Sequence, residues 1–319
     1  MAVLGAASGF AMAASNVTLY GVIETGVVVQ KAKHADTTVS MVSGFDQGSR
    51  WGIKGVEELG NGYSVGFVLE QGFDSDSGKN TESNSEGRTF GRESQMFVQG
   101  GFGKLGFGRF GTLSSGAGSY QILTGWALGT GYGLSSWTSA IGTSFSRADN
   151  AIAYASPSFG GFTIHAAYSN GTTDDVNKWS ENNHYYGLGL KYQAGAINSS
   201  LIFEATDGKA KLAADKKEKT FAVNYGLEYN LGAWTPMFAY QFATQDGGKR
   251  THMFGLSAKV AVGGGDALIG ARYLFGDKKY DTAEEESVRS WNVGAAYVYP
   301  LSKRTALKAY AGYADSSKG

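Results

Sequence analysis

The chain has 319 residues, with 48 Gly, 3 Pro, no Cys, and 28 acidic side chains against 28 basic ones. Glycine is at about twice its usual frequency of about 7%. Because each helical glycine costs roughly 1 kcal/mol relative to alanine, a helical bundle is excluded. The lack of cysteine excludes disulfide scaffolds and cysteine-based metal or redox sites. Zero net charge argues against nucleic-acid binding, and 42% hydrophobic residues argue against disorder.

Residues 2–13 form a short apolar run that ends in the small-residue site Ala11-Met12-Ala13. Such an ending is typical of a secretory signal peptide, here cleaved before Ala14, although the charged start of a signal peptide does not precede it. We expect residues 1–13 to be a signal-peptide remnant and residues 14–319 to form a single domain. The alternative is a buried or unstructured apolar N-terminus.

Alternation of apolar with polar or small residues predicts strands along the rest of the chain. In Phe221–Tyr229 the odd positions are Phe, Val, Tyr, Leu and Tyr, and the even positions are Ala, Asn, Gly and Glu. Segments 185–192 and 290–299 alternate in the same way. Because successive side chains point to opposite faces of a strand, each sheet face has one character. We expect fifteen strands, the first covering 16–32 and the last 305–314.

The connections between these strands alternate between short turns and long loops. The short ones carry Gly or Asn, as in Leu59–Gly62 and Val262–Asp266, whereas the long ones are polar, as in 33–47, 74–91 and 112–147. Short turns at one end and long loops at the other are typical of an outer-membrane β-barrel. Because such barrels close with an even number of strands, we expect a sixteenth strand beyond Gly319. A soluble β-sandwich or propeller is the alternative.

Several motifs occur in an order that resembles the general porins of Gram-negative bacteria. They are NVTLYG at 16–21, SRWGIKGVEELGNG at 49–62, FVLEQGF at 67–73 and GKLGFGR at 103–109. The resemblance implies an all-β, sixteen-stranded transmembrane antiparallel barrel in the outer membrane. It further implies a homotrimeric, water-filled channel for passive diffusion of small hydrophilic solutes and ions, surrounded by outer-membrane lipid and lipopolysaccharide. The third external loop, here about 112–147, would fold inward and narrow the pore.

Seven charged residues are the candidate pore-lining set: Arg50, Arg92, Arg147, Lys54, Glu70, Glu24 and Arg109. Alternation turns Arg50, Lys54, Glu70 and Glu24 inward, which avoids the roughly 2–4 kcal/mol cost of Arg or Lys at the lipid midplane. The family's basic wall corresponds best to Arg50, Arg92 and Arg147. The parity of Arg109, which immediately precedes the long loop, is outward. Rows of arginine favour anions, so we expect anion preference. The alternative is that these arginines pair with carboxylates and only stiffen the wall.

Two features depart from the family pattern. Residues 110–146 contain no Asp or Glu, although family members usually place acids on this loop opposite the basic wall. The predicted inward face of the sixth strand carries Ala153 and Ala155, where the family often has charged or polar side chains.

Two other functional classes remain as alternatives. A structural or adhesive barrel would lack an open pore. An enzyme barrel would need a nucleophile or activated water with a base, but the four histidines are scattered and have no metal-ligand spacing. We therefore expect no enzymatic activity, no cofactor and no metal.

Overall fold

The computed structural model describes residues 16–81, 88–116, 118–128, 143, 145–172, 179, 182–209, 217–246, 248–279 and 285–317. The expected signal-peptide remnant lies outside these residues. Within them, no helix has the length and apolar character needed to cross a membrane.

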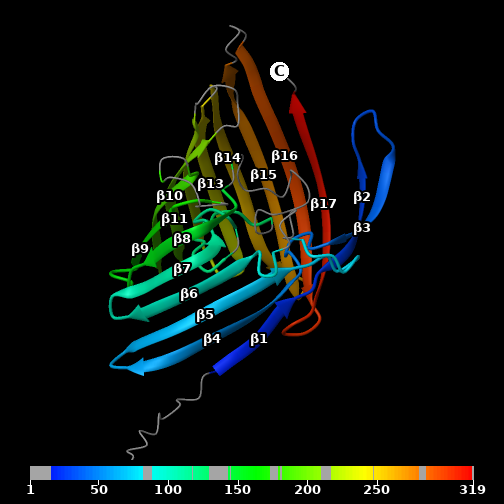
Figure 1. Ribbon diagram of the computed structural model, residues 1–319. Coiled ribbons are helices and arrows are strands. Elements are labelled where there is room, and N and C mark those ends of the chain that lie inside the picture. Colours follow the sequence, from blue (N-terminus) through cyan, green and yellow to red (C-terminus); the bar gives the residue numbers. More distant parts are fainter. Residues whose placement is uncertain are drawn as a thin grey trace, which may run out of the picture.

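Within the described ranges, fifteen strands form one antiparallel sheet that curls around an interior, with β4–β7 in front of β13–β16 (Figure 1). In sheet order they are β1 Asn16–Val22, β4 Arg50–Gly60, β5 Tyr63–Gly72, β6 Glu93–Gly100, β7 Gly103–Gly111, β8 Arg147–Ala155, β9 Phe162–Ser169, β10 His184–Ala194, β11 Ile197–Lys209, β12 Lys217–Tyr229, β13 Trp234–Gln245, β14 Lys249–Val262, β15 Gly265–Lys279, β16 Glu285–Pro300 and β17 Ala306–Ser317. The sheet is therefore a simple meander, as expected for a barrel of this class.

The short turns depend on residues that accept a left-handed backbone. Val262 pairs with Gly265, so the β14–β15 hairpin has a two-residue loop, Gly263-Gly264. Their φ angles are 63° and 81°. A two-residue hairpin with positive φ at both positions is a type I′ turn, which glycine adopts without a steric penalty. The local sequence Gly263-Gly264 therefore accounts for a tight turn between β14 and β15.

The prediction of one strand over 16–32 is wrong, and so is that of a loop over 33–47. The sheet strand β1 ends at Val22, and residues 25–43 form a separate hairpin of β2 Thr25–Lys31 and β3 Thr37–Ser43. This hairpin stands beside β17 in Figure 1. Its strands alternate as sheet strands do, so sequence periodicity could not reveal the break after Val22.

Outward aromatic side chains form two rows on β13–β16. Register aligns four of them in one row across neighbouring strands: Tyr240, Phe254, Tyr273 and Trp291. Trp234 and Tyr297 share another row, six residues nearer the short turns. At about 3.4 Å per residue the rows are about 20 Å apart along the strands. Aromatic girdles flanking an apolar band are typical of outer-membrane barrels.

The outward position of Leu256, between these rows, gives a stability test of the lipid-facing surface. Its side chain is 66% exposed. Leu256→Arg should lower the free energy of unfolding in lipid vesicles by about 2–4 kcal/mol, because it puts a guanidinium in hydrocarbon. Denaturant titration followed by tryptophan fluorescence measures this, with Leu256→Ala as the uncharged control. Equal stability of the two variants would contradict the assigned lipid-facing surface.

Candidate functional site

The described part of the long loop after β7 folds into the interior, as the resemblance to general porins implies. Within residues 112–116 and 118–128, several backbone N–H groups donate hydrogen bonds to side chains of the wall. Ser114 N–H donates to Glu204 Oε1 on β11 at 3.1 Å, and Gly125 N–H donates to Glu228 Oε1 on β12 at 3.2 Å. Ala127 N–H donates to Ser257 Oγ on β14 at 3.0 Å. The loop thus follows the inner wall instead of hanging free in the lumen.

Inward-facing glycines leave room for the loop. A Cβ at Gly226 would collide with the carbonyl oxygen of Thr124, and one at Gly255 would come within 2.9 Å of the Trp126 ring. A Cβ at Gly270 on β15 would lie 2.9 Å from Leu128 Cδ1. The loop can therefore approach the wall closely only because these positions lack side chains.

Alanines on β8 form a further apolar contact with the loop. Ala148, Ala151 and Ala153 on β8 are buried in one cluster with loop residues that include Leu113, Tyr120 and Ile122. The unusual alanine at position 153 is thereby explained: a charged side chain there would lie under the loop, away from water. Burial and the nearby Glu93 carboxylate raise the pKa of the Tyr120 phenol.

Three wall glutamates bind the loop. Glu93 accepts hydrogen bonds from Ser119 N–H at 2.5 Å and from Ser119 Oγ at 2.8 Å. Glu228 accepts from the Thr124 hydroxyl as well as from Gly125 N–H. Glu204 accepts from the Tyr185 hydroxyl at 2.7 Å. The carboxylates that the loop itself lacks are therefore supplied by the wall, and they hold loop atoms.

Two of the candidate arginines meet around one carboxylate. Arg92 Nε lies 2.7 Å from Glu70 Oε1, and Arg50 Nε lies 3.5 Å from Glu70 Oε2. The Tyr20 hydroxyl, from β1, donates to Glu70 Oε2 at 3.0 Å. We call Arg50, Glu70 and Arg92 the arginine cluster. Two guanidinium groups share one carboxylate, so the cluster keeps a positive charge.

Lys54 and Glu24 lie near this cluster but have other contacts. Lys54 Nζ is 5.2 Å from the centre of the Tyr20 ring, which is within cation–π range. Glu24 lies just after β1 and forms an ion pair of 2.7 Å with Lys308 Nζ on β17. This contact links the two end strands of the sheet.

Arg109 and Arg147 do not join the arginine cluster through any described contact. Arg109 Nη1 pairs with Asp149 Oδ1 at 2.5 Å, and Arg109 Nε donates to the carbonyl of Gly91 at 2.6 Å. Arg88 pairs with the same Asp149 carboxylate at 2.7 Å. Arg147 is the first residue of β8, opposite Gly111 in the register. These two arginines therefore lie at the rim where the long loop leaves and rejoins the sheet.

The residues of this interior that are outside the predicted set include Tyr20, Gln47, Glu93 and Lys104. Lys104 Nζ lies 4.0 Å from the centre of the Phe97 ring and 5.2 Å from that of the loop residue Tyr120. Lys104 lies two residues from Gly106 on β7, so alternation places both on the same face of the strand. Gln47 lies in a segment read as an external loop, so no sequence pattern indicated it.

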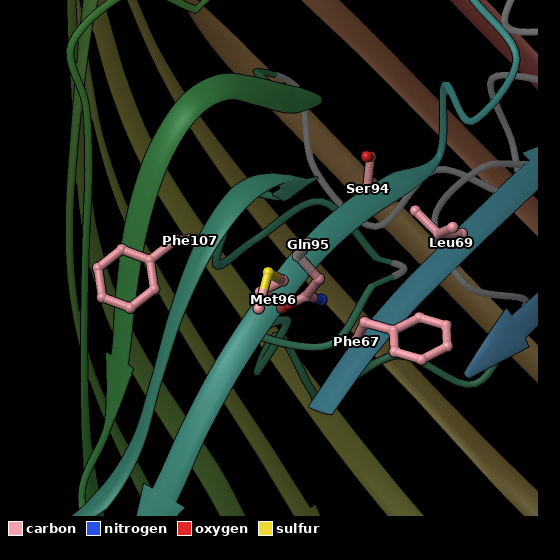
Figure 2. A pocket seen from close by; sticks show the side chains of 6 residues that line it. All are labelled: Phe67, Leu69, Ser94, Gln95, Met96 and Phe107. Atoms are coloured by element: carbon pink, nitrogen blue, oxygen red, sulfur yellow. The ribbon is translucent and has the colours of Figure 1, made fainter. Parts of the chain in front are cut away.

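A shallow pocket lies outside the lumen. It is lined by Phe67, Leu69, Ser94, Gln95, Met96 and Phe107, on the three neighbouring strands β5–β7 (Figure 2). Met96 and Phe107 are exposed on the outward face. In the described part of the chain, no group of three or more His, Cys, Asp or Glu side chains could hold a metal ion.

Loop anchoring makes a measurable prediction. Glu228→Ala should lower the free energy of unfolding by about 1.5–3 kcal/mol, since it removes hydrogen bonds to a charged group. The loop should then fluctuate, so single-channel currents in planar bilayers should become noisier. Glu58→Ala, at the exposed end of β4, is the control. Identical noise in the two variants would contradict the anchoring role.

Three comparisons relate nearly the whole chain to known outer-membrane proteins. It matches the family model for Gram-negative porins over residues 1–319. It is 30% identical to an outer membrane porin protein of Bordetella pertussis, over 99% of this chain and 93% of the relative. Among solved structures, an anion-selective porin from Comamonas acidovorans aligns with a TM-score of 0.67 and 28% identity, covering 95% of this chain and 89% of that one. OmpT of Vibrio cholerae, solved in a trimer form, aligns with a TM-score of 0.65 and 17% identity, covering 95% and 90%.

The meandering sheet, the inward loop and the family match over the full length lead to one conclusion. The chain belongs to the Gram-negative porin family and is an outer-membrane β-barrel that forms a diffusion channel.

Proposed function

We propose that this channel passes small hydrophilic solutes and ions passively and prefers anions, with Arg50 and Arg92 as the selective groups. The observation that carries the proposal is the arrangement of these two guanidinium groups around the single carboxylate of Glu70. Guanidinium stays charged at every physiological pH, so the cluster supplies a permanent positive field. Rows of Arg or Lys in a pore favour anions.

The absence of acidic residues from the constriction loop supports the proposed preference for anions. Residues 110–146 contain no Asp or Glu, so this loop places no formal negative charge opposite the arginine cluster. The wall carboxylates Glu93, Glu204 and Glu228 accept hydrogen bonds from loop N–H groups, whose dipoles point their positive ends at the carboxylates. The similarity to a porin described as anion-selective points in the same direction.

We infer that Arg147, Lys54 and Arg109 add to the field at the rim and in the wider lumen, whereas Glu24 orders neighbouring backbone. We further infer a homotrimer surrounded by outer-membrane lipid and lipopolysaccharide. The support for the trimer is the likeness to a porin-fold protein solved in a trimer form.

A structural or adhesive barrel and an enzyme barrel are the competing functions. We propose that the chain is neither, because it matches the porin family over its full length. Two of the described histidines have short polar contacts. His184 Nδ1 lies 3.1 Å from Asp207, and His252 Nδ1 lies 2.9 Å from the Tyr240 hydroxyl. Liposome swelling with small sugars distinguishes the functions, because a channel allows swelling and a plugged adhesin does not.

The selectivity proposal predicts the effect of removing one arginine. A unit charge about 4 Å from a passing ion is worth about 1 kcal/mol in water. Arg50→Ala should therefore lower the chloride-to-potassium permeability ratio several-fold in dilute salt, and less in concentrated salt because of screening. The reversal potential in a salt gradient across a planar bilayer measures this ratio. Arg250→Ala, on the outward face of β14, is the matched control. A cation-directed reversal potential in the unmodified channel would refute anion preference.

The trimer proposal has its own test. Without boiling, the refolded protein should migrate on detergent gels at three times the mass of the boiled chain, and chemical crosslinking should stop at three copies. A single monomeric band under both treatments, from protein that is active in bilayers, would refute the trimer.

A further inference from the structure

The segment Gly44–Ser49 connects β3 to β4 and forms a large bulge between the β2–β3 ladder and the β1–β4 ladder. The β1–β4 ladder ends at the pair Val22–Arg50, and the β2–β3 ladder begins at Thr25–Ser43. Only Ile23 and Glu24 therefore lie opposite six residues, 44–49. The surplus backbone must leave the sheet, and its contacts show where it goes. We call Gly44–Ser49 the inward segment.

The carboxylate of Glu24 holds the middle of the inward segment. It accepts the backbone N–H of Asp46 at 2.7 Å and that of Gln47 at 3.2 Å. Lys308 Nζ, on β17, contacts both Glu24 Oε2 and Asp46 Oδ2 at 2.7 Å. The Phe45 ring lies 4.6 Å from the ring of Tyr310, also on β17. These contacts place the segment inside the curled sheet, against its last strand.

A serine network holds the end of the inward segment next to β4. Ser49 Oγ donates to the carbonyl of Glu24 at 3.0 Å and accepts the Glu24 N–H at 3.0 Å. Ser75 Oγ donates to the same carbonyl at 2.8 Å. Backbone groups on both sides of Glu24 are thereby bonded, so the position of its side chain is fixed by its own main chain.

The inward segment touches both arginines of the arginine cluster. Arg50 donates from Nη1 to the carbonyl of Gly48 at 2.9 Å and from Nη2 to Gln47 Oε1 at 3.3 Å. Gly48 lies so close to Arg92 that a Cβ on it would be 3.1 Å from Arg92 Nη1. Glu70 alone would leave the far end of Arg50 free to rotate. The segment fixes the orientation of its planar head.

We propose that the inward segment is a second, short constriction element whose task is to orient Arg50 and Arg92 toward the ion path, with Glu24 as its positioning residue. The proposal rests on the anion pathway proposed above. It assigns Glu24 a role opposite to its charge: a carboxylate that supports anion selectivity by holding the groups that produce it.

This role and the plain charge effect predict opposite signs. If Glu24 acted only through its charge, Glu24→Gln would remove a negative charge from the lumen and raise the chloride-to-potassium permeability ratio. If Glu24 positions the arginines, Glu24→Gln loses one acceptor oxygen and the Lys308 ion pair. The segment then loosens, and the permeability ratio falls.

The experiment measures reversal potentials of full-length channels in planar bilayers under a salt gradient. Glu24→Gln should lower the permeability ratio in the unmodified background and raise it in the Arg50→Ala/Arg92→Ala background, where nothing remains to be positioned. Gln47→Ala changes no charge and should also lower the ratio. Its matched control is Gln99→Ala, in the lumen-facing set of β6 near the short turn, which should leave the ratio unchanged. Open-channel conductance confirms that each variant has folded.

The outcomes separate the two proposals. A ratio that rises for Glu24→Gln in both backgrounds, with Gln47→Ala equal to Gln99→Ala, overturns the positioning role and leaves the anion pathway intact. A ratio that Arg50→Ala/Arg92→Ala does not change overturns the anion pathway and the positioning role together. If Glu24→Gln gives no channels, the comparison of Gln47→Ala with Gln99→Ala decides: a lower permeability ratio for Gln47→Ala supports the positioning role, and equal ratios overturn it.

Discussion

The structure depends on one constraint: within hydrocarbon, each backbone N–H and C=O must find its partner in the protein itself. Here a fifteen-stranded antiparallel ladder satisfies most of these groups pairwise, from β1 to β17. Because the ladder fixes where each side chain points, every strand presents one face to lipid and the other to the lumen. The long loop can leave the ladder only toward the interior or the outside water, since an irregular backbone cannot face lipid.

A loop that runs along the inner wall creates a second demand, because its own backbone needs partners there. The wall supplies carboxylates that accept hydrogen bonds from the loop backbone: Glu93, Glu204 and Glu228. The wall also leaves space for the loop at three glycines: Gly226, Gly255 and Gly270. The consequence is electrostatic as well as steric. These three carboxylates are engaged with loop atoms, whereas Arg50 and Arg92 both pair with Glu70.

The same logic applies to the inward segment on a smaller scale. Six residues facing two cannot remain in a regular ladder, and the carboxylate of Glu24 compensates two of the backbone groups so displaced. In each case a glutamate next to irregular backbone has a structural task that its charge alone does not suggest. Counting charges along the wall would therefore misjudge what Glu24 and Glu228 do.

Alternation in the sequence predicts most of the strands and their faces, and the resemblance to general porins implies the inward loop. Alternation is a local consequence of strand geometry, so Phe221–Tyr229 and its counterparts could be assigned without a fold, and so could the inward parity of Arg50 and Glu70. No sequence pattern indicates that Arg50 and Arg92 share Glu70, that Gly226 lies under Thr124 or that Gln47 reaches Arg50. Those contacts join residues that are distant in sequence or lie where periodicity fails. They depend on how the ladder curls and where it breaks, which no single strand encodes.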